Sequence, residues 1–334
     1  MLNKAIIDLK KLTSNALTVK KTLPLGVKFN AVVKADGYGH GDIEVANALI
    51  NVADCFSVAL IEEGVKLRLS GIDKQILVFT EPISSADFML AVRFDLTVTV
   101  TKIDTLFLLE KECEVQKKSV SVHLKVNTGM NRCGIDGKVS LDGVLAIFEG
   151  LRWVKIDGVY SHLCCPEQKN ITERQVNNFL LAIKTVKRYN SKVTAHISAS
   201  GGFLQGFYFD MVRIGILLYG YKPFECDFFV EPVMKVYSPK VASRCVFKGD
   251  RLLYADKDLT VDKSVTLIRY GYADGLPRFT GDVNRCMDIS AVDSFNGKFY
   301  PVMTDADILA KRYGTISYEI LTSVARRAER IYLK

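Results

Sequence analysis

No stretch of this chain is apolar for long enough to cross a membrane. Apolar runs such as residues 214–218 fall far short of the roughly 20 residues that a membrane-spanning helix requires. The N-terminal residues, MLNKAIIDLKKLTSN, also lack the uninterrupted apolar segment and the small-residue cleavage site of a secretory signal. We therefore expect a soluble, cytoplasmic protein that does not bind a membrane.

Clustered charge and paired cysteines are lacking as well. Lys and Arg number 45 against 37 Asp and Glu, a net charge of +8, but the basic residues are scattered. Scattered charge is typical of a solvated surface and argues against nucleic-acid binding. The eight cysteines are irregularly spaced, Cys164-Cys165 is not a CxxC pair, and no Cys/His set has zinc-ligand spacing. We expect reduced thiols and no metal site.

The chain is rich in apolar residues that alternate between strand-like and helix-like patterns. Hydrophobic residues make up 49% of the 334, enough for a large core and more than one domain. Val/Ile-rich strands separated by helices indicate a parallel sheet covered by helices, and eight such units predict an α/β fold, a (β/α)₈ TIM-like barrel. The predicted barrel strands are residues 27–34, 55–60, 75–80, 96–101, 120–127, 154–161, 192–196 and 210–219. The predicted helices include residues 9–22, 42–51, 86–94, 102–117, 141–150 and 172–189.

Near residue 225 the pattern changes to strands without long helices between them, which predicts a mainly β C-terminal domain. We assign residues 1–224 to the barrel and 225–334 to the β domain, with residues 1–8, which include a predicted opening strand at 4–7, available to pair with the β domain. The predicted elements there are strands 230–237, 241–247, 251–254, 264–269, 287–292 and 299–304, a helix at 306–313 and an amphipathic tail at 319–330.

Lys34 ends the first predicted barrel strand and opens a glycine-rich turn, ADGYGHG. A lysine at the end of a buried strand is partly desolvated, which favours its neutral amine, the form that adds to a carbonyl carbon. The glycines around Tyr38 let the backbone approach a ligand closely. On the residues alone, a buried strand ending in a lysine whose ammonium group reaches solvent is an equally good interpretation.

Residues 31–41, AVVKADGYGHG, closely resemble the cofactor-lysine motif of the alanine racemases, which use pyridoxal 5′-phosphate (PLP). Further segments resemble motifs of that family, in the family's order and over nearly the whole chain. They are KVNTGMNR at 125–132, YSH at 160–162, HISASGG at 196–202, RIGILLYG at 213–220, GYADG at 271–275, CMD at 286–288 and SYE at 317–319. The resemblance implies PLP as cofactor and an amino-acid racemase, an isomerase with alanine as the expected substrate and D-alanine biosynthesis for peptidoglycan precursors as its role.

The resemblance also implies how the cofactor is held. Lys34 carries PLP as a Schiff base, and the phosphate is bound by Tyr38, Ser200, Gly215, Ile216 and Tyr318. Arg213 faces the pyridine nitrogen, where a guanidinium donates a hydrogen bond but keeps its proton, so the ring is a weaker electron sink. His162 supports the surrounding hydrogen bonds. Without the resemblance, Ser200 would be an ordinary helix N-cap, Arg213 a strand arginine paired with an acid, and His162 a core histidine.

Two residues are the expected catalytic bases. By the resemblance, Lys34 acts on the α-proton of the D-enantiomer and Tyr272 on that of the L-enantiomer, with the Arg213–His162 network lowering the pKa of the tyrosine. Alignment with the family motif GYADG selects Tyr272, which immediately precedes Ala-Asp-Gly, rather than Tyr270.

The remaining roles concern the substrate and the assembly. Arg132 meets the substrate carboxylate or the phenolic oxygen of the cofactor, and the backbone of Met287 touches that carboxylate. Lys125 corresponds to a lysine that is carbamylated in some members. In the family the β domain faces the barrel of a second subunit, which implies a homodimer with shared active sites.

Three departures from the family pattern leave alternatives open. Ala199 replaces a common asparagine, Asp36-Gly37 replaces Asn-Ala, and the segment 276–285 is short and lacks a tyrosine that often narrows the substrate entrance. A wider pocket would suit a racemase of serine or of a broader range of amino acids. A PLP-dependent decarboxylase of the same fold type is a second alternative, against which Arg213 and Tyr272 argue. A non-catalytic PLP-binding protein is a third, and an inactive racemase also stays open.

Overall fold

The computed structural model describes residues 1–280 and 283–334, without the side chains of Lys138, Val139, Phe279, Thr280 and Val283. Residues 281–282, which belong to the short segment predicted at 276–285, thus lie outside the described residues.

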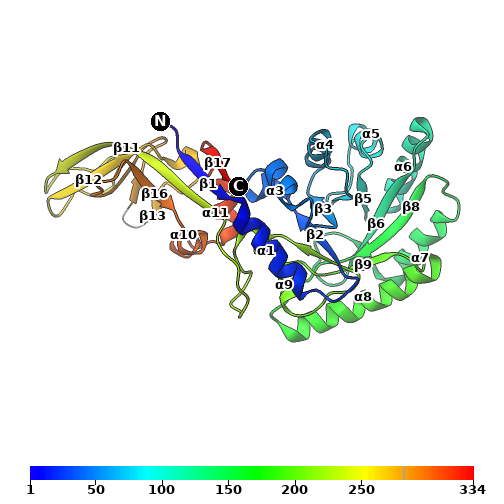
Figure 1. Cartoon of the computed structure of the whole chain (residues 1–334). Helices are drawn as coiled ribbons and strands as arrows, with labels where there is room; N and C mark the ends of the chain where they lie inside the picture. The colour runs from blue at the N-terminus through cyan, green and yellow to red at the C-terminus, as the bar shows by residue number, and fades with distance from the viewer. Residues whose placement is uncertain (281–282) are drawn as a thin grey trace. The chain divides into compact units, whose positions relative to one another are not determined.

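The chain divides into two compact units (Figure 1). The barrel unit comprises Thr13–Gly37 and Asp42–Val230. The β unit comprises Met1–Leu12, Tyr38–Gly41 and Glu231–Lys334. The turn after Lys34 therefore contributes Tyr38 to the β unit.

Eight strands paired in parallel form the ring of the barrel unit, in the order β10-β2-β3-β4-β5-β6-β8-β9. The backbone N–H groups of Asp210 and Arg213 donate hydrogen bonds to the carbonyls of Ala195 and Ser198, both at 3.0 Å, and thereby join the segments of β10 and β9. The predicted barrel is confirmed. Its strands are β2 (Lys28–Val32), β3 (Cys55–Val58), β4 (Ile76–Val78), β5 (Thr97–Val100), β6 (Val120–Asn127), β8 (Val154–Tyr160), β9 (Thr194–His196) and β10 (Met211–Ile214), and a short strand, β7 (Ile135–Asp136), pairs with β6.

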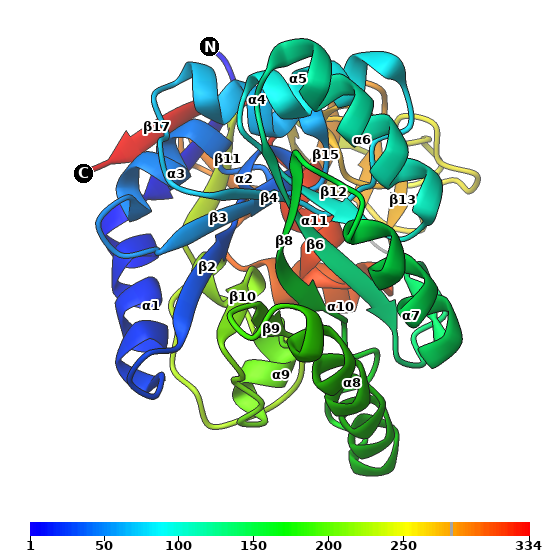
Figure 2. The same cartoon turned by 90° about the vertical axis from the view of Figure 1, so that its right-hand side faces the viewer.

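Helices cover the outside of this ring, as Figure 2 shows for α3 to α8. In α8, buried Gln175, Phe179, Ala182 and Val186 recur at helical spacing, which places one face of the helix against the strands. The helices are α1 (Leu9–Thr22), α3 (Asp42–Leu49), α4 (Ile61–Leu69), α5 (Ser85–Arg93), α6 (Ile103–Gln116), α7 (Gly137–Phe148), α8 (Lys169–Tyr189), α9 (Ser200–Leu204) and the 3₁₀ turn η1 (Ile216–Tyr219). None of the helices in the described part of the chain has both the length and the apolar character of a membrane span.

The predicted strand at 210–219 is wrong in its second half. β10 ends at Ile214, and Gly215 (φ −115°, ψ −89°) leaves the extended conformation before the 3₁₀ turn η1. The Leu218 N–H donates to the Gly215 carbonyl at 2.8 Å, and the Tyr219 hydroxyl donates to the Val32 carbonyl at 3.1 Å. A continuous apolar run has no periodicity that separates a buried strand from a buried helical turn.

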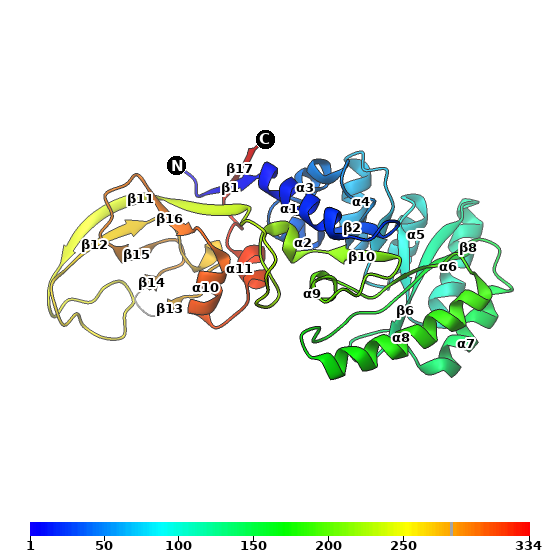
Figure 3. The ribbon, with the colours of Figure 1, turned by 60° about the horizontal axis from the view of Figure 1, so that its bottom comes forward.

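The β unit contains one mixed sheet, in the order β13-β14-β15-β12-β11-β1-β17, with β16 also paired to β11 (Figure 3). Leu252, Val265 and Ala291 form a core cluster on it. Its strands are β1 (Lys4–Asp8), β11 (Met234–Val246), β12 (Lys263–Ile268), β13 (Phe279–Thr280), β14 (Val283–Arg285), β15 (Ser290–Asp293), β16 (Phe299–Met303) and β17 (Glu329–Leu333). Its helices are α10 (Ala306–Tyr313), α11 (Ser317–Ser323) and the 3₁₀ turn η2 (Tyr272–Asp274).

Three predictions in this unit are wrong. The strands predicted at 230–237 and 241–247 are one long strand, β11, which passes an irregularity between Lys240 and Ala242. Residues 251–254 are not a strand, because Leu253 has a positive φ of 53° and the Leu259 N–H closes a loop onto the Asp250 carbonyl. The tail predicted at 319–330 is only partly helical, since β17 pairs in parallel with β1, a long-range contact that overrides local helix propensity.

Candidate active site

The turn after Lys34 has a left-handed backbone. Ala35 (φ 52°, ψ 51°), Asp36 (φ 53°, ψ 48°) and Gly37 (φ 60°, ψ 42°) share this conformation within α2 (Lys34–Tyr38), and Tyr38 continues it with φ 51°. Each non-glycine residue in this region costs about 1–2 kcal/mol. Such strain persists only where the surrounding structure over-determines it, so the contacts of the turn matter.

Glu63 of α4 holds the first residue of that turn. One carboxylate oxygen accepts a hydrogen bond from the Ala35 N–H at 2.6 Å, and the other accepts from Ala59 at 2.7 Å and Leu60 at 3.1 Å. The carboxylate thereby ties the residue after Lys34 to the end of β3. This role of Glu63 could not be predicted from the sequence, because acidic residues are common in the first turn of a helix.

Asp36, one of the departures from the family pattern, stabilises the same turn. Its carboxylate accepts a hydrogen bond from the Asp42 N–H at 3.3 Å and lies 3.5 Å from Lys66 Nζ, which also pairs with Asp42 at 2.6 Å. A Cβ on Gly37 would come within 3.2 Å of the Asp42 nitrogen and of Val45 Cγ2. An alanine at position 37 would therefore be strained and crowded, and an asparagine at position 36 would lose the charge that pairs with Lys66.

Lys34 lies in a partly buried, cationic environment. Burial lowers the pKa of its ammonium group, the positive charges of Arg132 and Lys125 lower it further, and the Glu63 carboxylate opposes them. Its Nζ is 6.0 Å from the centroid of the Phe79 ring. This environment favours the neutral amine, which is the nucleophilic and basic form.

Arg213 of β10 is 2% exposed and is held from several sides. Its Nη2 donates to the carbonyls of Ser161 at 2.8 Å and Ile197 at 3.0 Å and lies 3.4 Å from His162 Nδ1. Burial lowers the pKa of the guanidinium to about 10. Within the described residues it has no carboxylate partner and its Nε makes no hydrogen bond, so the Nε–H group can donate to a ligand.

A chain of two histidines continues from Arg213 into the barrel interior. Arg213 Nη1 lies 2.6 Å from His196 Nδ1, and His196 Nε2 lies 2.8 Å from His123 Nδ1. Because arginine only donates, His196 Nδ1 accepts, and the proton of neutral His196 lies on Nε2 and points to His123. The Tyr160 ring stacks on His196 at 4.9 Å. His196 stood in the HISASGG motif, but the sequence did not identify it as a partner of Arg213.

Burial and the charge of Arg213 lower the pKa of all three of these histidines. The pKa of His123 is about 3, and those of His162 and His196 lie well below the ordinary value. His162 is thus a neutral neighbour of Arg213.

Gln175 of α8 fixes the loops that carry His162 and the 125–132 motif. Its side-chain nitrogen donates to the His162 carbonyl at 3.0 Å and to Thr128 Oγ1 at 3.3 Å. Thr128 Oγ1 lies 2.7 Å from Ser161 Oγ. Arg132 follows on this loop with an exposed side chain.

Ser200 is the first residue of α9, and the N-cap is Ala199, one position before the serine that the sequence alone suggested as the cap. Its hydroxyl accepts a hydrogen bond from the Gly215 N–H at 3.2 Å, which joins the start of α9 to the end of β10. Ile216 follows as the first residue of η1. These three residues therefore lie together at one edge of the barrel unit.

Tyr38 and Tyr318 form a pair in the β unit, with ring centroids 6.0 Å apart and planes inclined by 48°. Burial raises the pKa of both hydroxyls, that of Tyr318 to about 12, so both remain protonated donors. Gly39 allows this approach, because a Cβ there would lie 2.3 Å from the Leu321 carbonyl oxygen.

The backbone segments that contain Tyr272 and Met287 are hydrogen-bonded to each other. The Tyr272 N–H donates to the Cys286 carbonyl at 3.0 Å, and the Ala273 N–H donates to the Met287 carbonyl at 3.1 Å. The Tyr272 side chain is 39% exposed and lines a pocket of about 500 Å³ within the β unit. Tyr270, in contrast, is buried and donates to the carbonyls of Asp274 and Val324 at 3.2 and 2.9 Å. Because Tyr272 is exposed and Tyr270 is buried, Tyr272 is the better candidate to contact a ligand.

Comparison with known proteins identifies the family. Residues 7–223 match the model of the alanine racemase N-terminal domain. The alanine racemase of Clostridium novyi (strain NT) is 34% identical over 372 aligned positions, which cover 99% of this chain and 95% of that protein. The chain belongs to the alanine racemase family. Alanine racemase 1 of Bacillus subtilis (strain 168) is 30% identical, with 99% and 92% of the two chains covered. The solved alanine racemase of Clostridium difficile 630 superposes with a TM-score of 0.90 at 27% identity, over all of this chain and 96% of that one.

The alanine racemase family is PLP-dependent, and the residues of the barrel unit fit that cofactor. Lys34 has the depressed pKa of an amine that can bond to an aldehyde. The Nε of Arg213 makes no hydrogen bond to the described residues, since the bonds of this guanidinium run from Nη1 and Nη2, and it can therefore donate to an acceptor nitrogen in a ring. The structure thus brings Lys34, Arg132, His162 and Arg213 together in the barrel unit, and in the β unit it pairs Tyr38 with Tyr318 and Tyr272 with Met287.

Proposed function

We propose that this protein is a PLP-dependent racemase that interconverts L-alanine and D-alanine with Lys34 and Tyr272 as its two bases. The observation that carries the proposal is the buried guanidinium of Arg213, which has no carboxylate partner among the described residues and an unused Nε donor. Enzymes that need a strong electron sink place an acid at the ring nitrogen, whereas arginine keeps the ring unprotonated. An unprotonated ring is a weaker electron sink, which suits a proton exchange at the α-carbon better than a decarboxylation.

Lys34, Arg213 and the phosphate-binding residues are the groups that would hold the cofactor. When bound, PLP withdraws electrons from an amino acid bonded to it and so acidifies the α-carbon hydrogen. Arg213 Nε would donate to the ring nitrogen. Ser200, Gly215, Ile216, Tyr38 and Tyr318 would bind the phosphate as hydrogen-bond donors.

The two bases work on opposite faces of the α-carbon. Lys34 Nζ, neutral because of its lowered pKa, takes the α-proton of the D-enantiomer, and its ammonium form returns a proton to the same face. The phenolic oxygen of Tyr272 does the same for the L-enantiomer: its deprotonated form takes the α-proton, and its hydroxyl form returns a proton to that face. Arg132, and the backbone of Met287, would hold the substrate carboxylate in place through charge and hydrogen bonding.

The protein would act as a homodimer in which the β unit of one subunit completes the active site of the other. Three exposed residues of the β unit support this proposal: Tyr272 (39% exposed), Met287 (55%) and Ile316 (62%). Tyr272 and Met287 belong to family motifs, so their exposure is consistent with contact to a second subunit.

A racemisation assay on a panel of L-amino acids tests this function. Purified protein supplied with PLP should convert L-alanine to D-alanine faster than it converts serine, lysine or arginine. The pocket beside Tyr272, which is also lined by Arg278, Glu319 and Arg326, favours inclusion of the larger substrates. Faster turnover of serine or lysine would show that alanine is not the preferred substrate. Release of carbon dioxide without a D-amino acid would show that the protein is not a racemase.

A further inference from the structure

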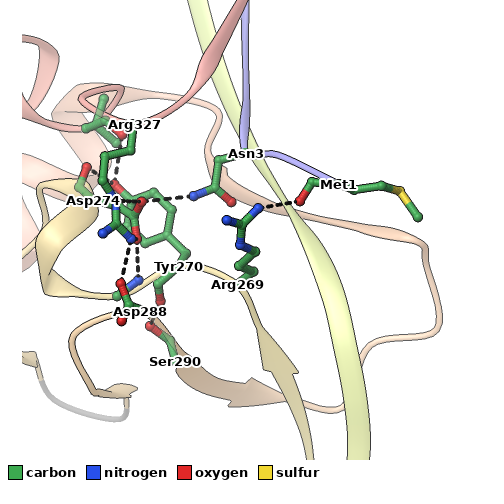
Figure 4. A network of polar contacts seen from close by, with 10 residues as sticks. Met1, Asn3, Arg269, Tyr270, Asp274, Asp288, Ser290 and Arg327 are labelled. Carbon is green, nitrogen blue, oxygen red and sulfur yellow. Dashed lines mark hydrogen bonds and ion pairs between the residues drawn. The ribbon is translucent and has the colours of Figure 1, made fainter.

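Arg327 bonds to two aspartates that flank the segments of Tyr272 and Met287. Its Nε and Nη2 donate to the Asp274 carboxylate at 2.9 and 3.2 Å, and Nη2 also donates to Asp288 Oδ1 at 2.8 Å (Figure 4). Asp274 is two residues after Tyr272, and Asp288 directly follows Met287. One guanidinium from the C-terminal segment thus joins both segments.

Asp274 is the fixed end of this arrangement, because its side chain is only 2% exposed. The Gly271 N–H donates to Asp274 Oδ2 at 2.8 Å, and Asn3 Nδ2 donates to Oδ1 at 3.1 Å. Together with Arg327, these donors satisfy a carboxylate that would otherwise be costly to bury. The hydrogen bond to Gly271 closes the short turn η2, in which Tyr272 lies.

Close packing of this turn leaves little room for the backbone to move. A Cβ on Gly271 would lie 2.0 Å from the Met287 carbonyl oxygen, and a Cβ on Gly275 (φ +118°) would lie 1.9 Å from the Ser323 carbonyl oxygen. The turn is therefore packed between the Met287 segment and the C-terminal end of α11, four residues before Arg327.

The Tyr272 side chain itself makes no hydrogen bond to any residue that the structure describes. Its direction therefore depends on the backbone of η2, which depends on Asp274 and its partners. A reacting group must lie within a fraction of an ångström of its productive position, and a misplacement of about 1 Å can cost as much as 100-fold in rate.

We propose that Arg327 is a positioning residue that holds Tyr272 and Met287 in the geometry their roles require, by joining Asp274 to Asp288. This inference rests on the proposed function of Tyr272 as the base for the L-enantiomer. Arg327 does not touch the substrate; it acts through the two aspartates. Lysine cannot replace it, because one ammonium group lacks the planar fork that reaches both carboxylates.

Three variants test the inference. Arg327→Lys keeps the charge beside buried Asp274 and removes the fork. Asp288→Asn weakens the outer pair alone, at a side chain that is 59% exposed, and so preserves folding if Arg327→Lys does not. Arg251→Lys is the matched control, since it alters another arginine–aspartate pair of the β unit, with Asp258, that holds neither Tyr272 nor Met287.

The decisive readout is exchange of the α-proton in deuterated water. Arg327→Lys should slow exchange from L-alanine roughly 10- to 100-fold and leave exchange from D-alanine, which depends on Lys34, nearly unchanged. Asp288→Asn should show the same asymmetry to a smaller extent, and Arg251→Lys should match the wild type. Amide hydrogen exchange should also become faster in residues 271–275, whose N–H groups are bonded within this network.

The outcomes separate this inference from the proposed function. If wild-type protein shows no α-proton exchange, the proposed function is wrong. The inference about Arg327 is then tested by amide exchange alone, which should be faster in residues 271–275 of the Arg327 and Asp288 variants than in the wild type. If the wild type is active and Tyr272→Phe shows the asymmetry but Arg327→Lys and Asp288→Asn do not, the positioning role is wrong. If Arg327→Lys and Asp288→Asn slow α-proton exchange from both enantiomers equally, Arg327 stabilises the fold in general and does not position Tyr272.

Discussion

Arg213 Nη1 and His196 Nδ1 are 2.6 Å apart in the interior of the barrel unit, with the Arg213 guanidinium as the donor. The contact fixes the tautomer of His196 and, through it, the direction of the bond to His123. It also explains how a buried cation is stabilised although no acidic partner occurs among the described residues. Neutral histidines and carbonyl groups surround it instead.

The first prediction concerns acid stability. The pKa values of His123, His162 and His196 lie below the unfolded value near 6.5, so the unfolded chain binds more protons at lower pH. Their stabilising contribution is complete above about pH 6.5 and is lost as pH falls towards the folded pKa values. The free energy of unfolding, measured by urea titration, should fall by up to about 1.4 kcal/mol per pH unit for each histidine.

The variant His123→Asn provides the control for this effect, because it removes one of the three titrating groups. Its slope between pH 6 and pH 4.5 should be shallower than that of the wild type by about 1.4 kcal/mol per pH unit. Identical slopes in the two proteins would contradict a neutral His123 in the folded state.

The second prediction is that the cofactor is bonded to Lys34. Borohydride reduction of the PLP-loaded protein, followed by peptide mapping, should find the label on the peptide that contains Lys34. The reason is its depressed pKa, which leaves more neutral amine than an ordinary lysine has. A label on Lys125 or another lysine would overturn the site assignment.

The fold was largely predictable because the barrel repeats one local pattern. Apolar strands and amphipathic helices recur along residues 27–219, and strands such as β3, β4, β5 and β10 are buried on both faces. Lys34 was visible for the same reason, since it interrupts that pattern at the end of a strand. The end of β10 could not be predicted in this way. The apolar run continues through Gly215, and the 3₁₀ turn that follows is joined to β2 by the hydrogen bond from the Tyr219 hydroxyl to the Val32 carbonyl.

The missed parts of the site depend on pairs of residues far apart in the chain. Arg327 and Asp274 are 53 positions apart, and Glu63 and Ala35 are 28 apart. No local periodicity encodes such a pair. The β17 strand was missed for a related reason, because its partner β1 lies at the opposite end of the sequence.

The third prediction tests Glu63. Glu63→Gln keeps the shape but removes a charge and one acceptor oxygen from the three N–H groups that it binds. The free energy of unfolding should fall by about 2 kcal/mol, the usual loss for charged hydrogen bonds. The pKa of Lys34 should fall further, because Glu63 is a group that raises it. Glu62→Gln, on the exposed face of the same helix, should change neither quantity. Equal effects of the two variants would refute the anchoring role.

The fourth prediction concerns the shared active site. Lys34→Ala and Tyr272→Ala subunits should each be inactive alone, and a mixture that has exchanged subunits should regain part of the activity. The recovered activity arises because a mixed dimer has one site with both bases intact. Mass spectrometry should establish that heterodimers formed. Heterodimers without activity would reject a site built from two chains.

The most direct test of the two-base account is α-proton exchange by Tyr272→Phe in deuterated water. The variant should still exchange the proton of D-alanine through Lys34, while exchange from L-alanine and racemisation fall by a factor on the order of 100 or more, the usual worth of a positioned base. Tyr270→Phe, which removes only a buried hydroxyl bonded to Asp274 and Val324, should lose stability without this asymmetry. Equal loss of exchange from both enantiomers, or nearly normal racemisation by Tyr272→Phe, would contradict the account.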